Sequence, residues 1–131
     1  MAGKVTGKNL KTRKKQMVTL ACRIVHARDK GVCRFCGQSK AKMDASHCLP
    51  RSRGWRYAVD TANIILLCST CHRRWHDEPT WGAAMLRENC PDVAQYIDGL
   101  IHPVRPVSVE EAKERLFQLN ALAESLGMDA L

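Results

Sequence analysis

Two pairs of cysteines, each with two residues between its members, constrain this chain more than any other feature of its sequence. Cys33 and Cys36 form the first pair and Cys68 and Cys71 the second, with 31 residues between the pairs. A C-x-x-C turn directs two thiolates towards one point, and two such turns can complete a closed tetrahedral zinc site. The N-terminus leads into no long apolar stretch resembling a secretion signal, so we expect zinc ligation rather than disulfides. The three other cysteines are expected to be small apolar core residues: Cys22, Cys48 and Cys90.

Two histidines, His72 and His76, follow the second cysteine pair directly. Residues i and i+4 share one face of a helix, so these two imidazoles can chelate a second metal ion. Upstream, His47 falls within an expected strand over residues 43–49, and Asn63 opens a short apolar run that predicts a second strand leading into Cys68. A helix is expected to begin near Ser69 or Thr70, so the order is strand, loop, strand, helix.

These residues resemble the HNH endonucleases, whose active unit is a ββα-metal fold. The matching segments lie within about residues 30–80: Cys33-x-x-Cys36, Ser46-His47-Cys48-Leu49-Pro50-Arg51-Ser52-Arg53-Gly54, Asn63-Ile-Ile-Leu-Leu-Cys68 and Cys71-His72-x-x-x-His76. Arg56-Tyr57-Ala-Val-Asp60-x-x-Asn63 and Arg-Trp-His-x-x-Pro at 74–79 look most like the phage and bacterial subset related to recombination-enhancement nucleases. The resemblance implies an α+β fold with a small ββα-metal core and a structural four-cysteine zinc site, flanked by an N-terminal helix and C-terminal helices.

The resemblance also implies a role for each matching residue in hydrolysis of a DNA phosphodiester bond to a 5′-phosphate and a 3′-hydroxyl. His47 would be the general base, and Asn63 would fix the loop and the orientation of that base. His72 and His76 would bind the catalytic metal, and the four cysteines the structural zinc. A histidine has a suitable pKa for deprotonating water, and a metal ion can neutralise charge on the reacting phosphate.

The position before the general base departs from the family pattern, in which it holds a metal-binding Asp or His. Ser46 stands there and is a weak ligand at best. Asp44 shares its strand face but lies about 6–7 Å further along, so we do not expect it to reach the ion directly. Two imidazoles favour Mn²⁺, Ni²⁺ or Co²⁺ over Mg²⁺ as the catalytic ion, because Mg²⁺ prefers oxygen ligands.

The charge is divided unevenly along the chain. Residues 1–76 hold 17 Lys/Arg and 3 Asp/Glu, a net of +14; residues 77–131 hold 4 and 10, a net of −6, which together give the +8 of the chain. A basic half of this density predicts a polyanionic partner, here DNA. Five arginines near the motif are expected to contact phosphates: Arg51, Arg53, Arg56, Arg73 and Arg74. Such contacts predict weak sequence preference and binding that falls steeply with salt.

The remaining sequence predicts a basic arm and several helices. Residues 1–15 carry six Lys/Arg and no acidic residue, which is typical of a mobile arm. Apolar residues at helical spacing predict a helix over residues 16–30. Downstream, helical stretches are expected over residues 81–87 and 92–100, and Ser108 and Glu111 form a capping box that opens a final helix. We therefore expect three regions: a flexible arm (1–15), a zinc-braced nuclease core with its leading helix (16–82) and an acidic helical extension (83–131).

Other interpretations are also compatible with the sequence. His72 and His76 could share a second structural zinc with His47 or Cys48, which would make the chain a two-zinc DNA-binding module without catalysis. The apolar stripe of the last helix could pack on its own domain, form a homodimer, or dock onto phage or host DNA-processing machinery. No apolar run approaches the roughly 20 residues that a membrane span needs, so we expect a cytoplasmic protein.

Overall fold

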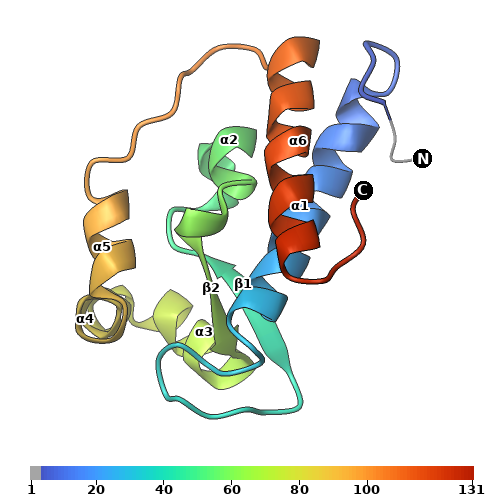
Figure 1. The fold of residues 1–131 in the computed structure, drawn as a ribbon. Coiled ribbons are helices and arrows are strands. Elements are labelled where there is room, and N and C mark those ends of the chain that lie inside the picture. Colours follow the sequence, from blue (N-terminus) through green and yellow to red (C-terminus); the bar gives the residue numbers. More distant parts are fainter. Residues whose placement is uncertain (1–3) are drawn as a thin grey trace.

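An antiparallel two-stranded hairpin lies at the centre of the computed structural model, which describes residues 4–131 (Figure 1). Strand β1 (Met43–His47) pairs with β2 (Ile64–Cys68) in a register that sets Met43 opposite Cys68 and His47 opposite Ile64. Helix α3 (Ser69–Asp77) follows β2 without a loop. The predicted order of strand, loop, strand and helix is confirmed, although β1 ends two residues before the predicted Leu49.

The hairpin separates two hydrophobic clusters, because β2 is buried on both faces. Ile64 and Leu66 belong to a cluster with α1 (Leu10–Arg28) and α6 (Val109–Ser125), which lie side by side. Ile65 and Leu67 belong to the other cluster, with the cysteine pairs and the helices that follow α3. Since side chains alternate along a strand, this division gives each face of the hairpin its own core.

Helix α1 begins earlier than the sequence predicts. It starts at Leu10 instead of residue 16, and Val5 before it is only 3% exposed, within the α1–α6 cluster. The amide of Thr6 donates to Asn9 Oδ1 over 2.8 Å, which forms the turn that leads into the helix. Residues 10–15 are therefore helical and Val5 packs on the core, while residues 1–3 of the predicted arm lie outside the described residues.

The C-terminal half adds three helices. Helices α4 (Pro79–Asn89) and α5 (Pro91–Ile97) each begin with a proline. Proline suits this position because the first residues of a helix have no partner for an N–H group, so its missing N–H costs nothing there. The predicted stripe of α6 is buried against the chain's own core at four positions: Ala112, Leu116, Leu119 and Ala123. Leu126, just after the end of the helix, is 41% exposed. The stripe therefore serves intramolecular packing, and the proposed three-region division of the chain stays a prediction.

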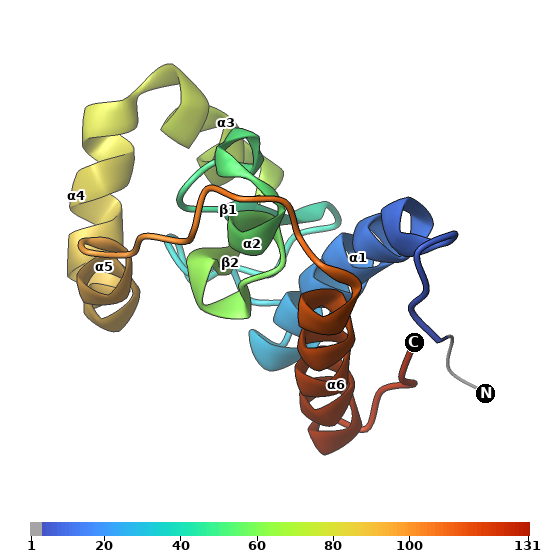
Figure 2. The same ribbon diagram turned by 90° about the horizontal axis from the view of Figure 1, so that it is seen from above.

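The loop between the strands carries a 3-10 turn (Arg51–Arg53), the short helix α2 (Trp55–Ala58) and a second 3-10 turn (Thr61–Asn63). The segment over residues 98–108, which joins α5 to α6, crosses over α2 (Figure 2). His102 in this segment donates its amide to the Tyr57 hydroxyl over 2.9 Å, so the crossing segment is attached to the inter-strand loop.

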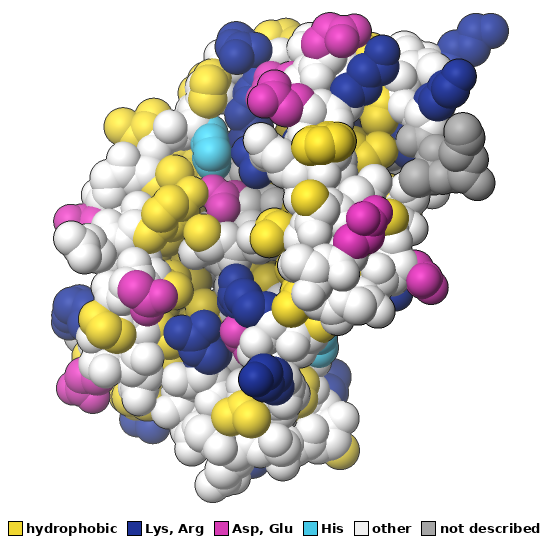
Figure 3. All heavy atoms as spheres, viewed as in Figure 1, with side chains coloured by type: hydrophobic (Ala, Val, Ile, Leu, Met, Phe, Trp, Pro, Cys, Tyr) yellow, Lys and Arg dark blue, Asp and Glu magenta, His cyan; other side chains and the backbone are white. Residues whose placement is uncertain are grey.

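Asp29 connects the end of α1 to β2 and to the first cysteine pair. Its carboxylate accepts hydrogen bonds from Arg28 Nε (2.8 Å), the Leu66 amide (3.0 Å) and Arg34 (3.3 Å). Burial would raise the pKa of this carboxyl, but the hydrogen bonds from Arg28 and Leu66 outweigh it and lower the pKa. Arg28, Asp29 and Arg34 line a hollow. Figure 3 shows basic and acidic side chains next to each other in a depression of the surface.

The described structure confirms the α+β fold class, with a hairpin and helix, a four-cysteine cluster, an N-terminal helix and C-terminal helices. No helix within residues 4–131 combines the length and apolar character needed to cross a bilayer.

Candidate functional site

The four predicted cysteines converge in one cluster. Their sulfur atoms all lie within 4.8 Å of one another, and Cys36 Sγ is 3.9 Å from Cys68 Sγ. In the first turn, the Gly37 amide donates to the Cys33 carbonyl over 2.9 Å, and Gly37 has a positive φ of 73° that suits glycine. In the second, the Cys71 amide donates to Cys68 Sγ over 3.4 Å, at the point where β2 passes into α3.

The donor set of this cluster fits zinc. A disulfide needs sulfur atoms about 2.05 Å apart, whereas four sulfurs around one zinc at about 2.3 Å lie roughly 3.8 Å from one another. Burial raises the pKa of Cys33, but amides of Cys36, Cys68 and Phe35 donate to its sulfur and lower the pKa to about 7. Burial and the neighbouring sulfurs raise the pKa of Cys36 and of Cys71. A bound cation would therefore be needed to hold all four as thiolates.

The two predicted chelating histidines lie side by side on α3. His72 Nε2 and His76 Nε2 are 3.1 Å apart, and the ring centroids are 4.8 Å apart. Two nitrogens at this separation can share a proton or can both bind one cation at about 2.1 Å. The pair therefore presents two ring nitrogens to a common position.

Asp44 orients this pair. Its Oδ2 lies 3.2 Å from His72 Nδ1, which assigns the proton of His72 to Nδ1 and leaves Nε2 free as an acceptor. A carboxylate on the second nitrogen of a metal-binding histidine is a common supporting contact. The contact of Asp44 with His72 was not predicted, and the expectation that Asp44 does not reach the ion stays a prediction. The sequence argument considered only the distance of Asp44 from Ser46 along the strand, whereas the partner of Asp44 is His72 on α3.

Ser46 does not join the histidine pair. Its side chain is buried, with the residue 2% exposed, and its hydroxyl donates to the Asp44 carbonyl over 3.2 Å. The predicted weak metal ligand is therefore engaged within its own strand.

His47, the predicted base, has one ring nitrogen held by the backbone. Its Nε2 lies 2.9 Å from the Ala58 carbonyl oxygen, which can only accept, so the proton is assigned to Nε2 and the lone pair to Nδ1. Burial lowers the pKa of His47, and the charges of Arg51 and His72 lower it further, against the opposing effect of the Ala58 hydrogen bond. The ring is therefore neutral and basic at Nδ1 near pH 7.

Asn63 is fully buried and closes the loop that holds this base. Its amide nitrogen donates to the carbonyls of Leu49 (2.9 Å) and Tyr57 (3.2 Å), and its Oδ1 accepts from the Leu49 amide (2.8 Å). Both ends of the inter-strand loop are thereby joined, one residue away from the Ala58 carbonyl that binds His47. The role that the resemblance implies for Asn63, orienting the base, stays a prediction.

Along β1, Asp44 lies opposite Leu67 and His47 opposite Ile64, so these two β1 side chains leave the strand on opposite sides. A cavity of about 660 Å³ surrounds the histidine pair and is lined by Lys42, Asp44, His72, Arg73 and His76 among others. Within the described residues, His47 is not part of this lining. Its link to the pair is electrostatic, through the effect of His72 on its pKa.

The five predicted phosphate-binding arginines differ in their availability. Arg51, Arg53 and Arg73 are exposed. Arg74 is bonded to Glu78 over 3.0 Å and lies 4.1 Å from the Trp81 ring centroid, so it joins α3 to α4.

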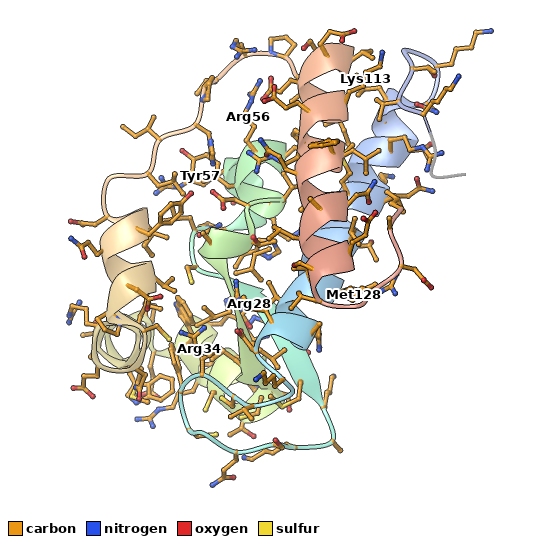
Figure 4. All side chains as sticks on the ribbon, viewed as in Figure 1. Arg28, Arg34, Arg56, Tyr57, Lys113 and Met128 are labelled. Atoms are coloured by element: carbon orange, nitrogen blue, oxygen red, sulfur yellow. The ribbon has the colours of Figure 1, made fainter. Side chains whose placement is uncertain are left out.

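Arg56 is buried at 7% exposure and points towards α6 and the crossing segment (Figure 4). It donates to both Glu111 carboxylate oxygens and to the carbonyls of Pro103 and Arg105 (2.8 and 2.9 Å). These protein acceptors occupy the guanidinium, so Arg56 is removed from the predicted set of phosphate contacts. The sequence did not predict this structural role of Arg56, because its partner Glu111 lies 55 residues away along the chain.

The comparison with protein families agrees with this geometry. Residues 33–78 match the family model described as HNH endonuclease. The similarity to this family is limited to that segment. The match begins at the first cysteine of the cluster, spans His47, Asn63, His72 and His76, and covers 46 of the 131 residues. Comparison with curated proteins and with solved structures finds no significant match.

Proposed function

We propose that this chain is a metal-dependent DNA endonuclease of the HNH type, with His47 as its general base. The observation that carries this proposal is the Nε2 contact of His47 with Ala58, which leaves a neutral, basic Nδ1 inside an HNH-type segment. The lowered pKa supports it, because a base must be unprotonated at the working pH. The narrower likeness to phage and bacterial recombination-enhancement nucleases stays a prediction.

In the proposed reaction, Nδ1 of His47 takes a proton from the water that attacks the phosphorus atom. The Ala58 carbonyl then stabilises the resulting imidazolium through Nε2–H. His72 and His76 would hold a divalent cation, which supplies charge neutralisation at the phosphate. Asp44 keeps His72 in the tautomer that such binding requires. As the new bond to phosphorus forms, the bond from phosphorus to the 3′ oxygen breaks, and the leaving oxygen takes a proton from solvent, which gives a 5′-phosphate and a 3′-hydroxyl. The exposed Arg51, Arg53 and Arg73 bind neighbouring phosphates.

The proposed metals differ between the two sites. Zn²⁺ is assigned to the four cysteines, where it would stabilise the folded core. Mn²⁺, Ni²⁺ or Co²⁺ is favoured over Mg²⁺ at the histidine pair, because imidazole nitrogen suits these ions better than it suits Mg²⁺. Plasmid cleavage that is much faster with Mg²⁺ than with Mn²⁺ would contradict this assignment.

The decisive experiment compares nicking of supercoiled plasmid by the parent chain and by His47→Ala, each loaded with zinc and supplied with Mn²⁺. General-base catalysis is worth roughly 10²–10⁴ in rate, so the variant should lose activity to that extent while it keeps its circular dichroism spectrum and DNA binding. His26→Ala, a histidine exposed on α1, is the matched control and should cut like the parent. Equal cutting by His47→Ala and the parent would refute the assigned base.

Metal content separates this proposal from the two-zinc DNA-binding module. After dialysis, the nuclease should retain one zinc per chain and the module two. His47 and Cys48 offer little to a second closed zinc site: His47 is not among the residues that line the cavity around the histidine pair, and burial raises the pKa of Cys48 to about 12.

A further inference from the structure

A groove of about 530 Å³ runs between the N-terminal half of α1 and the inter-strand loop. Four of its lining side chains are cationic: Lys11, Lys14 and Lys15 from α1, and Arg51 from the loop. Val18 and Trp55 add apolar surface to its wall. Segments about forty residues apart in the sequence thus build one basic groove.

The closely spaced lysines of α1 destabilise the helix slightly by charge repulsion. Lys11 and Lys15 are four residues apart on one face, where like charges repel each other. Among the residues that the structure describes, none of the four groove cations lies within salt-bridge distance of a carboxylate, whereas Arg56 and Arg74 both do. The positive charge of the groove is therefore uncompensated by the protein, which favours an anionic occupant.

Trp55 gives the groove a firm wall. Its indole nitrogen donates to the Lys14 carbonyl over 3.0 Å, which joins the loop to α1. The Lys14 ammonium lies 5.6 Å from the centroid of the Trp55 ring. The two sides of the groove are thus held together by a direct hydrogen bond, and the Lys14 ammonium lies over the indole at its wall.

The groove is continuous with the loop that holds His47. Arg51 lines the groove, and its charge also lowers the pKa of His47. Trp55 belongs to α2, the same short helix whose last residue, Ala58, binds the His47 ring. A strand lying in the groove would therefore pass close to the proposed base.

We propose that this groove binds the sugar-phosphate backbone of the DNA beside the scissile phosphate, with the three lysines and Arg51 on successive phosphates. The inference rests on the proposed function for its substrate, and it adds α1 to the DNA-contacting surface. Because lysine contacts to phosphate carry no base information, the groove positions DNA without reading its sequence.

The test measures DNA affinity against salt for the zinc-loaded full chain without a second metal, using a fluorescent duplex oligonucleotide. A Lys11→Gln, Lys14→Gln, Lys15→Gln triple variant should lower the slope of log K against log salt by about 2–3, since each lost phosphate contact contributes about 0.9. The matched control replaces three exposed lysines outside the groove with glutamine, Lys30, Lys40 and Lys113, and should change the slope by less than about 1, the contribution of a single phosphate contact.

The outcomes separate this inference from the proposed function. A loss of slope confined to the groove variant supports the groove, even if no variant or parent cuts plasmid. Equal losses in both triple variants, or no loss in either, would overturn the groove while leaving the cleavage result of the parent untouched. Failure of the parent to bind DNA would also overturn it. Circular dichroism spectra that match the parent exclude unfolding as the cause of a lost slope.

Discussion

A single carboxylate decides how the histidine pair is presented. Asp44 is bonded to the Nδ1 side of His72, so the ring is held with Nε2 towards His76. Supporting contacts of this kind are worth roughly 10–100-fold in metal affinity. Ser46, two residues along the strand, has its hydroxyl turned to a backbone carbonyl instead.

Asp44→Asn should therefore weaken Mn²⁺ binding by roughly 10–100-fold, because the amide keeps the shape but loses the charge that polarises His72. Calorimetric titration of the zinc-loaded protein with Mn²⁺ provides the measurement. Ser46→Ala is the control and should leave the Mn²⁺ affinity within about twofold of the parent, a tolerance well below that supporting effect. If Ser46→Ala weakens binding as much as Asp44→Asn does, the serine is a ligand after all.

The pKa of His47 offers a second test at this scale. Burial is the largest cause of the lowered pKa of His47, and the charges of Arg51 and His72 lower it further by repelling the protonated ring. Removing a positive charge makes protonation easier, so Arg51→Gln should raise the pKa of His47 and shift the onset of its protonation to higher pH. Titration of the ring resonances by NMR measures this shift. Arg53→Gln, in the same turn, is the control, and a similar shift in both variants would contradict the assigned effect of Arg51.

At the scale of the elements, α3 and α4 meet through one close approach. A Cβ added at Gly82 would lie 2.7 and 2.8 Å from two atoms of the Trp75 ring. That ring is stacked on Phe35, with centroids 5.4 Å apart, so it has little freedom to move away. Phe35 in turn lies between the two cysteines of the first turn, so this contact connects α4 to the cysteine cluster.

Gly82→Ala should lower the free energy of unfolding by about 1–3 kcal/mol, because the added methyl group overpacks the contact with Trp75. The better helix propensity of alanine should offset up to about 1 kcal/mol of this loss. Urea denaturation of the zinc-loaded protein measures this change. Gly99→Ala is the matched control, because nothing lies within 4 Å of a Cβ at that position. Unchanged stability of Gly82→Ala would mean that α4 shifts away from Trp75 without loss.

The capping box of α6 shows how tertiary contacts alter a local motif. The Ser108 hydroxyl accepts from the Glu111 amide over 3.1 Å, as the sequence predicts. The Glu111 carboxylate, however, is bonded to Arg56 of α2 instead of returning to the start of its own helix. That pairing lowers the pKa of Glu111. The helix start is local, and the use of its glutamate is decided by another element.

At the scale of the whole molecule, Arg56 holds three separate segments together: α2, the crossing segment and α6. Replacement by methionine fills similar space but leaves two carbonyls without their side-chain donor and Glu111 with only the exposed Arg105. Arg56→Met should therefore lower the melting temperature and increase amide hydrogen exchange in α6 and residues 98–108. Arg105→Gln, which removes an exposed arginine from the same carboxylate, should have little effect. Unchanged exchange in α6 of Arg56→Met would show that α1 alone holds that helix.

Spacing along the chain was sufficient for the features that lie within one turn, strand or helix. The C-x-x-C turns, the apolar β2 and the i, i+4 pair of His72 and His76 were predicted because backbone geometry sets which neighbours in sequence become neighbours in space. The start of α6 at Ser108 belongs to the same class. The position of α1 was predicted only in part, since packing of Leu10 and Val5 lengthened the ordered segment.

Tertiary structure alone decided which charged group meets which partner. Asp44 and His72 are 28 residues apart, and Arg56 and Glu111 are 55 residues apart. Arg51, Arg56 and Arg74 look equivalent in the sequence, yet one faces a groove, one is buried and one is stacked on an indole. An arginine side chain can satisfy its charge with phosphate, carboxylate or carbonyl oxygen, and only the docking of distant segments determines which of these lies within reach.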